Sequence, residues 1–497
     1  MPVEPSRRAL LTTAVGGAVA GAAVVASARA EAAAPVATDP VLHAVRRLSY
    51  GATPSLVAHV RQVGVSAWVD QQLSGSPDVS ATLHGTGLAS LPLPPEQAAM
   101  AMNAVQHYGI TDLQAQTFAR AAFGDNQLYE LLVELFSNHL SIYGPTFPAY
   151  KAVDDSQVIR KNVLGTFADM LAASAQSPAM LLYLNQAYSS GDNPNENYAR
   201  ELLELHTVGA DGGYHQRDVH QAALTLTGLT VEPDTGVFQY RPEWHHVGPV
   251  RVMGWSHPNA DRDRGLDVAL SLIAYLAHHP RTAQRIATKV VRRLVSDSPP
   301  PSLVASSAAV YRANGTAIVP VVKHVISSRE FQQSAGQKSQ RPFEWFAQCV
   351  RVLGLTPSPD LASNGGAVVE ALRELGQAPF AWSPPNGYPD TAVAYASTAT
   401  MLARWNAAQA LVHGSIAGLG KPDVTTLLGT PAPATAGACV DRLALVLLGI
   451  RPRAALKRAV LTGAGLTAGR VLTPTQAQSA ALPMAALLLS SPEALVR

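Results

Sequence analysis

The chain has 497 residues, of which 47% are hydrophobic and 14% are charged. This composition excludes an intrinsically disordered chain, because disorder goes with high charge and low hydrophobicity. Two cysteines are too few for a disulfide-rich scaffold. The 37 basic and 35 acidic residues nearly balance, so bulk charge does not attract nucleic acid and we expect no nucleic-acid partner.

The N-terminus carries the pattern of an export signal. Arg7-Arg8 precedes a charge-free run from Ala9 to Ala26, and Ala28-Arg29-Ala30 follows that run. A basic start, an apolar middle and an Ala-x-Ala end are typical of a secretory signal, and the segment resembles the twin-arginine (Tat) class. We therefore predict a signal over residues 1–30 and a linker over 31–39. An uncleaved anchor helix is the alternative, because the run could just span a bilayer.

This signal predicts export through the Tat route. The expected location is the extracellular space or the cell envelope, which is the periplasm if the cell has an outer membrane. We expect contact with the membrane only through an uncleaved signal.

From residue 40 onward, apolar residues recur mostly at helical spacing. The pattern predicts helices over residues 40–73 with a break at 51–54, then over 97–123, 126–142, 154–175, 178–185, 196–208 and 217–227, and again from 263 to the C-terminus. The fold class that we predict is all-α and multi-helical. Residues 40–497 form one helical region, or two packed subdomains over 40–260 and 261–497.

One short segment departs from helical spacing. Between residues 230 and 240, Val, Thr and Phe flank Asp234-Thr235-Gly236, and glycine supplies the turn conformation of a β-hairpin. The run from Val250 to Met253 predicts a further short strand. We therefore expect a small β-hairpin insertion near 230–254.

The densest group of polar residues lies on the helix predicted over 196–208. Asn197, Glu201 and Glu204 are spaced i, i+4 and i+7, which places them on one face. Carboxylates beside Arg200 can hold a metal or a substrate hydroxyl, or Arg200 and Glu204 form an ion pair on a solvated helix. Asp218, in the next helix, either joins this polar face or caps the helix start.

Histidines supply candidate metal ligands. Asn138 and His139 end a helix, and His245-His246 lie on a loop after a tryptophan. Because imidazole is the commonest metal ligand, these histidines indicate a divalent metal as the candidate cofactor, although a single histidine on a helix is also common in a protein core. Cys349 and Cys439 either form a disulfide outside the cytoplasm or remain buried thiols.

Several segments, in the same order, resemble the bacterial family called domain of unknown function 1800. The resemblance covers nearly all of the chain after the signal, and its strongest part is Asn195 to Gly209. Asn185 and His246 stand where the family pattern has aspartate, which removes two carboxylates from a metal site. The other matching segments are His43–Gly51, Phe136–Leu140, Pro178–Asn185, Trp244–Gly254, Arg341-Pro342 and Leu375–Asp390. The resemblance implies a common fold and candidate residues, but no reaction.

Two functions remain open. The first is an exported metal- or carboxylate-dependent hydrolase that acts on envelope or extracellular polymer. The second is a non-enzymatic envelope protein that binds polysaccharide or has a structural role, with a buried polar network. The first assigns catalysis to Glu201, Glu204, Arg200 and Asp218, substrate binding to Asn138, Asn197, Asn386 and Tyr388, and metal ligation to His139, His245 and His246.

Overall fold

The computed structural model describes residues 39–74, 109–359 and 361–497. The predicted signal over 1–30 and nearly all of the predicted linker lie outside these residues, as does the first part of the helix predicted over 97–123. In the described residues, no helix combines the length and the apolar character needed to cross a membrane.

The structure confirms the all-α prediction with a small β insertion. Strands β1 (Leu229–Val231) and β2 (Phe238–Tyr240) pair antiparallel around the predicted turn. The strand predicted near 250 is β3 (Val250–Val252), which pairs antiparallel with β4 (Trp255–His257). The insertion is therefore two separate two-stranded sheets, of which the sequence indicated one complete hairpin.

The first half of the fold contains α2 to α14. The α-helices are α2 (Pro40–Leu48), α3 (Pro54–Val63), α4 (Val65–Gln72), α7 (Ile110–Phe123), α8 (Gln127–His139), α9 (Pro148–Asp154), α10 (Phe167–Ala175), α11 (Pro178–Tyr183), α12 (Glu196–Glu201), α13 (Gln216–Leu226) and α14 (Gly265–His278). Two π-helical segments, η3 (Asp155–Arg160) and η5 (Leu202–His206), continue α9 and α12.

The second half consists of helices joined by loops. Its helices are α15 (Pro280–Leu294), α16 (Pro301–Ala313), α17 (Ile318–Ser327), α18 (Arg329–Gln333), α19 (Pro342–Val352), α20 (Leu361–Glu374), α21 (Thr398–His413), α22 (Val424–Leu428), α23 (Ala436–Leu448), α24 (Ala454–Gly463) and α25 (Pro474–Leu489).

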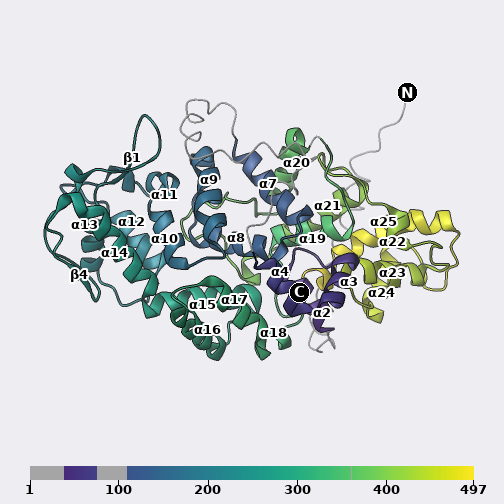
Figure 1. Cartoon of the computed structure of the whole chain (residues 1–497). Helices are drawn as coiled ribbons and strands as arrows, with labels where there is room; N and C mark the ends of the chain where they lie inside the picture. The colour runs from purple at the N-terminus through teal and green to yellow at the C-terminus, as the bar shows by residue number, and fades with distance from the viewer. Residues whose placement is uncertain (1–38, 75–108, 360) are drawn as a thin grey trace, which may run out of the picture.

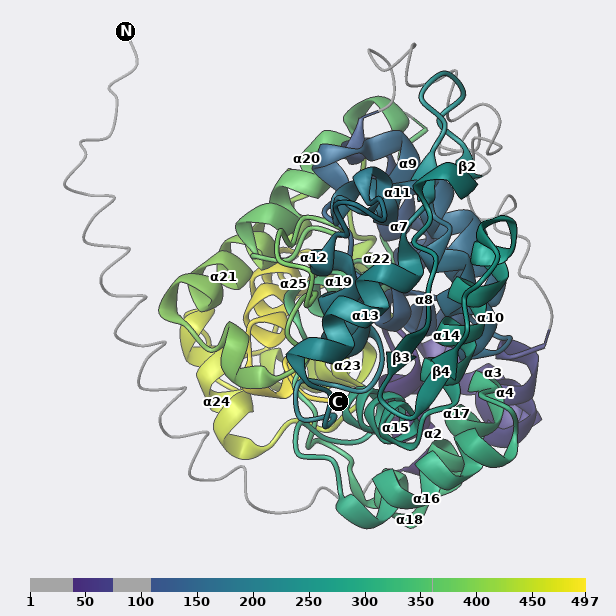
Figure 2. The ribbon, with the colours of Figure 1, turned by 90° about the vertical axis from the view of Figure 1, so that its left-hand side faces the viewer.

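Apolar side chains form two buried clusters. The first draws on residues between Ala44 and Phe331, and the second combines α7 with residues from Phe343 to Ala494. In Figure 1, α10 to α14 lie at one end of the molecule and α21 to α25 at the other, with α8 and α19 between them. Figure 2 faces the end that carries α13, β3 and β4. The first cluster includes residues on both sides of residue 260. The division into subdomains at 260/261 stays a prediction.

The prediction of one continuous helix over 154–175 is wrong, because the chain forms two helical segments there. The chain forms the π-helical segment η3 and then turns at Gly165 before α10 begins. The Thr166 hydroxyl accepts a hydrogen bond from the Asp169 backbone N–H at 3.1 Å, which caps the new helix. Apolar spacing on both sides of this turn is helical, so periodicity alone does not reveal the break.

Candidate functional site

A buried ionic network joins α8, α15 and α19 at the centre of the protein. Arg293 and Arg341 donate to the same Glu134 oxygen, Oε2, at 2.6 and 2.8 Å. Glu344, 1% exposed, pairs with Arg293 and Arg341 and accepts from Arg497 Nη2 at 2.6 Å. Buried charges persist where partners and hydrogen bonds compensate for lost water. This network therefore fixes the two halves of the fold against each other.

The network extends to Asp390, which follows the loop over residues 383–389. Lys338 Nζ lies 2.5 Å from Asp297 Oδ1 and 3.0 Å from Asp390 Oδ1. Burial raises the pKa of Asp390, but the positive charges of Arg341, Lys338 and Arg293 together lower it by more. The resulting pKa lies below the ordinary range of an aspartate. Asp390 is therefore ionised and positions the preceding loop.

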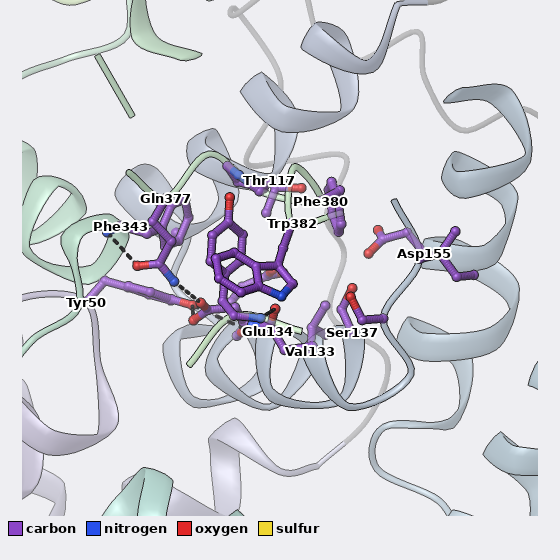
Figure 3. A pocket seen from close by; sticks show the side chains of 17 residues that line it. Tyr50, Thr117, Val133, Glu134, Ser137, Asp155, Phe343, Gln377, Phe380 and Trp382 are labelled. Carbon is purple, nitrogen blue, oxygen red and sulfur yellow. Dashed lines mark hydrogen bonds between the residues drawn. The ribbon is translucent and has the colours of Figure 1, made fainter. Parts of the chain in front are cut away.

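The segment 377–388, which precedes Asp390, forms one wall of a small cavity beside the network, which we call the junction cavity (Figure 3). Its volume is 40 Å³, and α7, α8, α19, η3 and residues 377–388 surround it. Two of the predicted substrate-binding residues, Asn138 and Tyr388, line this cavity. A third, Asn386, accepts a hydrogen bond from Trp382 Nε1 at 2.8 Å and so positions one wall.

Gly387 explains how the loop approaches α8 so closely. Its φ is +70°, and a Cβ at this position would lie 2.1 Å from the backbone oxygen of Asn138. Glycine adopts this conformation without strain and, having no Cβ, leaves that space empty. The backbone N–H of Tyr388 then reaches Asn138 Oδ1 at 3.4 Å.

The opposite wall comes from the π-helical segment η3, which the sequence analysis did not identify. Arg160 Nε donates to Asp155 Oδ2 at 2.6 Å, and its two terminal nitrogens donate to Glu130 at 2.8 and 3.0 Å. Asp155 and Glu130 both line the junction cavity. A π turn changes the direction of side chains and is frequent at functional sites. The acidic pair Asp154-Asp155 was visible in the sequence, but its position against α8 was not.

The segment with the strongest polar pattern lies elsewhere, on α12 and η5. Arg200 Nη2 donates to Gln216 Oε1 at 3.0 Å, and Asn197 Nδ2 donates to the Leu184 carbonyl at 3.3 Å. Glu204 accepts from the Tyr214 hydroxyl at 3.0 Å. Burial and the nearby charge of Glu204 raise the pKa of Glu201, which is partly buried. None of these four predicted residues lines the junction cavity.

Asp218 is a buried capping residue in the structure. Its Oδ2 accepts from the His215 backbone N–H at 2.8 Å, and its Oδ1 accepts from the Met253 backbone N–H at 2.7 Å. These bonds cap α13 and fix the turn between β3 and β4. Both oxygens are therefore occupied by backbone donors.

The three predicted metal ligands do not form one metal site in the described residues. His139 is buried, with Nε2 2.9 Å from the His206 carbonyl, and burial lowers its pKa well below the usual range. His245 is also buried, 2.9 Å from both the Thr227 carbonyl and the Asn259 side chain. Within the described ranges, no group of three or more His, Cys, Asp or Glu residues is arranged to hold a metal ion. The two cysteines are free thiols in the structure.

His245 and His246 line a second feature, which we call the surface hollow. It has a volume of 540 Å³ and is open to solvent. The Gly191 backbone N–H donates to the Trp244 carbonyl at 2.7 Å, which joins the two loops that form the hollow. Its lining side chains are Tyr188, Ser190, Asp192, Glu243, Trp244, His245, His246, Val247 and Arg262.

The fold and these sites define a multi-helical protein that is built around a buried ionic network, with a small central cavity and a separate open hollow. The chain belongs to the family described as protein of unknown function (DUF1800), whose family model matches residues 43–496. In the comparisons, no curated protein and no solved structure matches the chain. Membership of this family therefore does not indicate which reaction, if any, the protein catalyses.

Proposed function

We propose that the protein is exported through the twin-arginine route and binds polysaccharide of the cell envelope, with the surface hollow as the binding site. The signal pattern over residues 1–30 supports export. The observation that carries the binding proposal is the pairing of aromatic and polar side chains around the hollow. Of the two functions left open by the sequence, this is the non-enzymatic one.

The aromatic side chains offer apolar faces to a sugar ring. Tyr188 is 67% exposed, an unusual state for so large a side chain, and Trp244, which lines the same hollow, is half-buried. The Arg241 guanidinium lies over one face of the Trp244 ring, 4.9 Å from its centre, so a sugar would meet the opposite face. A tyrosine or tryptophan combines an apolar face with one polar atom, which suits the C–H faces and hydroxyls of a saccharide.

The polar side chains favour an uncharged ligand with many hydroxyls. Asp192 and Glu243 accept hydrogen bonds, whereas Arg262 donates them. Burial lowers the pKa of His246, so its imidazole is neutral at pH 7 and can both donate and accept. Because the hollow carries both acidic groups, Asp192 and Glu243, and a basic group, Arg262, a strongly charged polymer is disfavoured.

The test is binding of the full chain to purified envelope polysaccharide, measured by isothermal titration calorimetry. Tyr188→Ala removes the exposed ring, and we expect the dissociation constant to rise about tenfold, which corresponds to about 1.4 kcal/mol. Leu402→Ala is the matched control, because Leu402 is also exposed and does not line the hollow. Equal binding by both variants and the wild type would contradict the proposal.

A carboxylate-dependent hydrolase is the second candidate, and Glu201 favours it. A carboxyl group with a raised pKa stays protonated to higher pH, as a general acid requires, and a second carboxylate, Glu204, lies on the same segment. Release of reducing ends from the polysaccharide tests this function. Loss of release in Glu201→Gln, with release retained in Glu196→Gln, supports hydrolysis; no release by the wild type excludes it for that polymer.

A further inference from the structure

The junction cavity contains a buried carboxylate oxygen without a partner. Asp155 is 2% exposed, and its Oδ2 accepts from Arg160. Its Oδ1 is buried and accepts no hydrogen bond from any described residue. The side chain points toward the cavity in Figure 3. Because an unpaired buried acceptor is costly, this oxygen calls for a donor in the cavity.

The charges around Asp155 indicate what kind of donor fits. Burial raises the pKa of Asp155, but the charges of Arg160, Lys151 and Arg120 outweigh burial and hold the pKa below its ordinary value. Arg160 also neutralises Glu130, and Lys151 pairs with Asp154 at 2.7 Å. These basic side chains already neutralise the carboxylates around the cavity. A cation bound in the cavity would therefore gain little electrostatic stabilisation.

An anion is equally disfavoured. Glu134 lies in the cavity wall and is ionically paired with two arginines, and the Asp155 carboxylate faces the same space. A negative group would meet the carboxylates of Glu130, Glu134 and Asp155 at close range in a medium of low dielectric constant. The remaining class of ligand is neutral and donates a hydrogen bond.

The walls favour a hydroxyl group on a short carbon chain. Phe343, Phe380 and Trp382 supply aromatic surface, and Ser137 and Ser141 add hydroxyl groups. The ring centres of Trp382 and Tyr388 lie 5.1 Å apart, so the loop wall is itself packed. A cavity of 40 Å³ admits one group of about the size of a water molecule. The cavity is partly open, so the rest of a larger ligand would extend out of it.

We propose that the junction cavity binds the terminal hydroxymethyl group of a small neutral polyol, with Asp155 Oδ1 accepting the hydrogen bond of the hydroxyl. The site is separate from the surface hollow and does not depend on polysaccharide binding there. Its ligand would contact α8, η3 and the 377–388 loop together, and so would stabilise the junction between these elements.

The test is binding of glycerol to the full chain, measured by saturation-transfer NMR and by thermal shift. Glycerol should bind in the millimolar range and raise the melting temperature, whereas ethylammonium and acetate at equal concentration should not. Asp155→Asn replaces an acceptor by a mixed donor and acceptor, and should weaken glycerol binding at least tenfold. Stronger binding of ethylammonium than of glycerol overturns the proposal.

Asp154→Asn is the matched control, because Asp154 is equally buried but both its oxygens have partners, Lys151 and Ser177. This variant should lose stability and keep the affinity for glycerol. If Asp155→Asn does not fold, Trp382→Ala opens the cavity and should weaken binding without touching the Arg160 pairs. The proposal is wrong if glycerol gives no saturation-transfer signal with the wild type. It is also wrong if Asp155→Asn and Asp154→Asn give the same signal as the wild type, because the cavity then holds water only.

Discussion

Glu344 is the position at which the buried network can be tested most sharply. Its carboxylate accepts from the Arg341 backbone N–H at 2.9 Å and pairs with three guanidinium groups while only 1% exposed. Glu344→Gln keeps the size of the side chain and removes its charge. The three arginines then keep their positive charge in a buried site, and loss of one partner from a buried ion pair costs about 3–5 kcal/mol.

The matched control is Glu370→Gln on α20. Glu370 pairs with Arg373, and both side chains are more than half exposed. An exposed pair contributes about 0–1 kcal/mol. Urea unfolding at pH 7 measures both variants against the wild type, and a difference of less than about 1 kcal/mol between them refutes the claim that the network holds the fold together.

The pH dependence gives an independent check on the same residue. Burial raises the pKa of Glu344, but Arg293, Arg497 and Arg341 lower it well below the ordinary 4.5. A carboxyl with a depressed folded pKa stabilises the protein above its unfolded pKa, and this stability is lost as pH falls through the folded pKa. The difference in unfolding free energy between the wild type and Glu344→Gln should therefore become smaller below about pH 4.5. A constant gap would contradict the assigned pairing.

Three further predictions concern the loop, a buried histidine and the cysteines. Gly387→Ala should cost about 2–5 kcal/mol in thermal unfolding because of the clash at Asn138, whereas Gly376→Ala, at a positive φ with open space, should cost only about 1–2 kcal/mol. Burial, with the nearby positive charges of α15, lowers the pKa of His206 from 6.5 to about 3, so its contribution to stability is lost as pH falls from 6.5 toward 3. His206→Asn should reduce the slope of unfolding free energy between pH 6 and 4 by about 1.4 kcal/mol per pH unit, and an unchanged slope contradicts this. The thiols of Cys349 and Cys439 should react with Ellman's reagent only after unfolding. If the unfolded protein shows no reactive thiol, the two cysteines form a disulfide.

Much of the fold followed from periodicity. The α-helical class and the hairpin around Asp234-Thr235-Gly236 were predicted because apolar spacing changes where the secondary structure changes. The π-helical segments at Asp155–Arg160 and Leu202–His206 were not, because one inserted residue shifts a helix face and leaves the spacing nearly unaltered. The partner of β3, which is β4 (Trp255–His257), was not predicted.

The sites, like the fold, were only partly predictable from the sequence. The loop from Asn386 to Tyr388 was singled out from the sequence and lies at the junction cavity, since glycine between polar residues marks a close backbone approach. The pairing of Glu134 with Arg293 and Arg341 joins residues 159 and 207 positions apart. A single sequence contains no signal for such distant contacts. The family-like segments around Arg341 and Asp390 were visible, but their convergence on Glu134 required the structure.

Hydrogen–deuterium exchange with and without the purified polymer shows whether the surface hollow binds envelope polysaccharide. We expect slower exchange confined to the two loops of the hollow, residues 188–193 and 241–248, and we expect this change to be absent in Tyr188→Ala. Protection of residues 196–206 in place of those loops, or no protection at saturating polymer, would contradict this proposal.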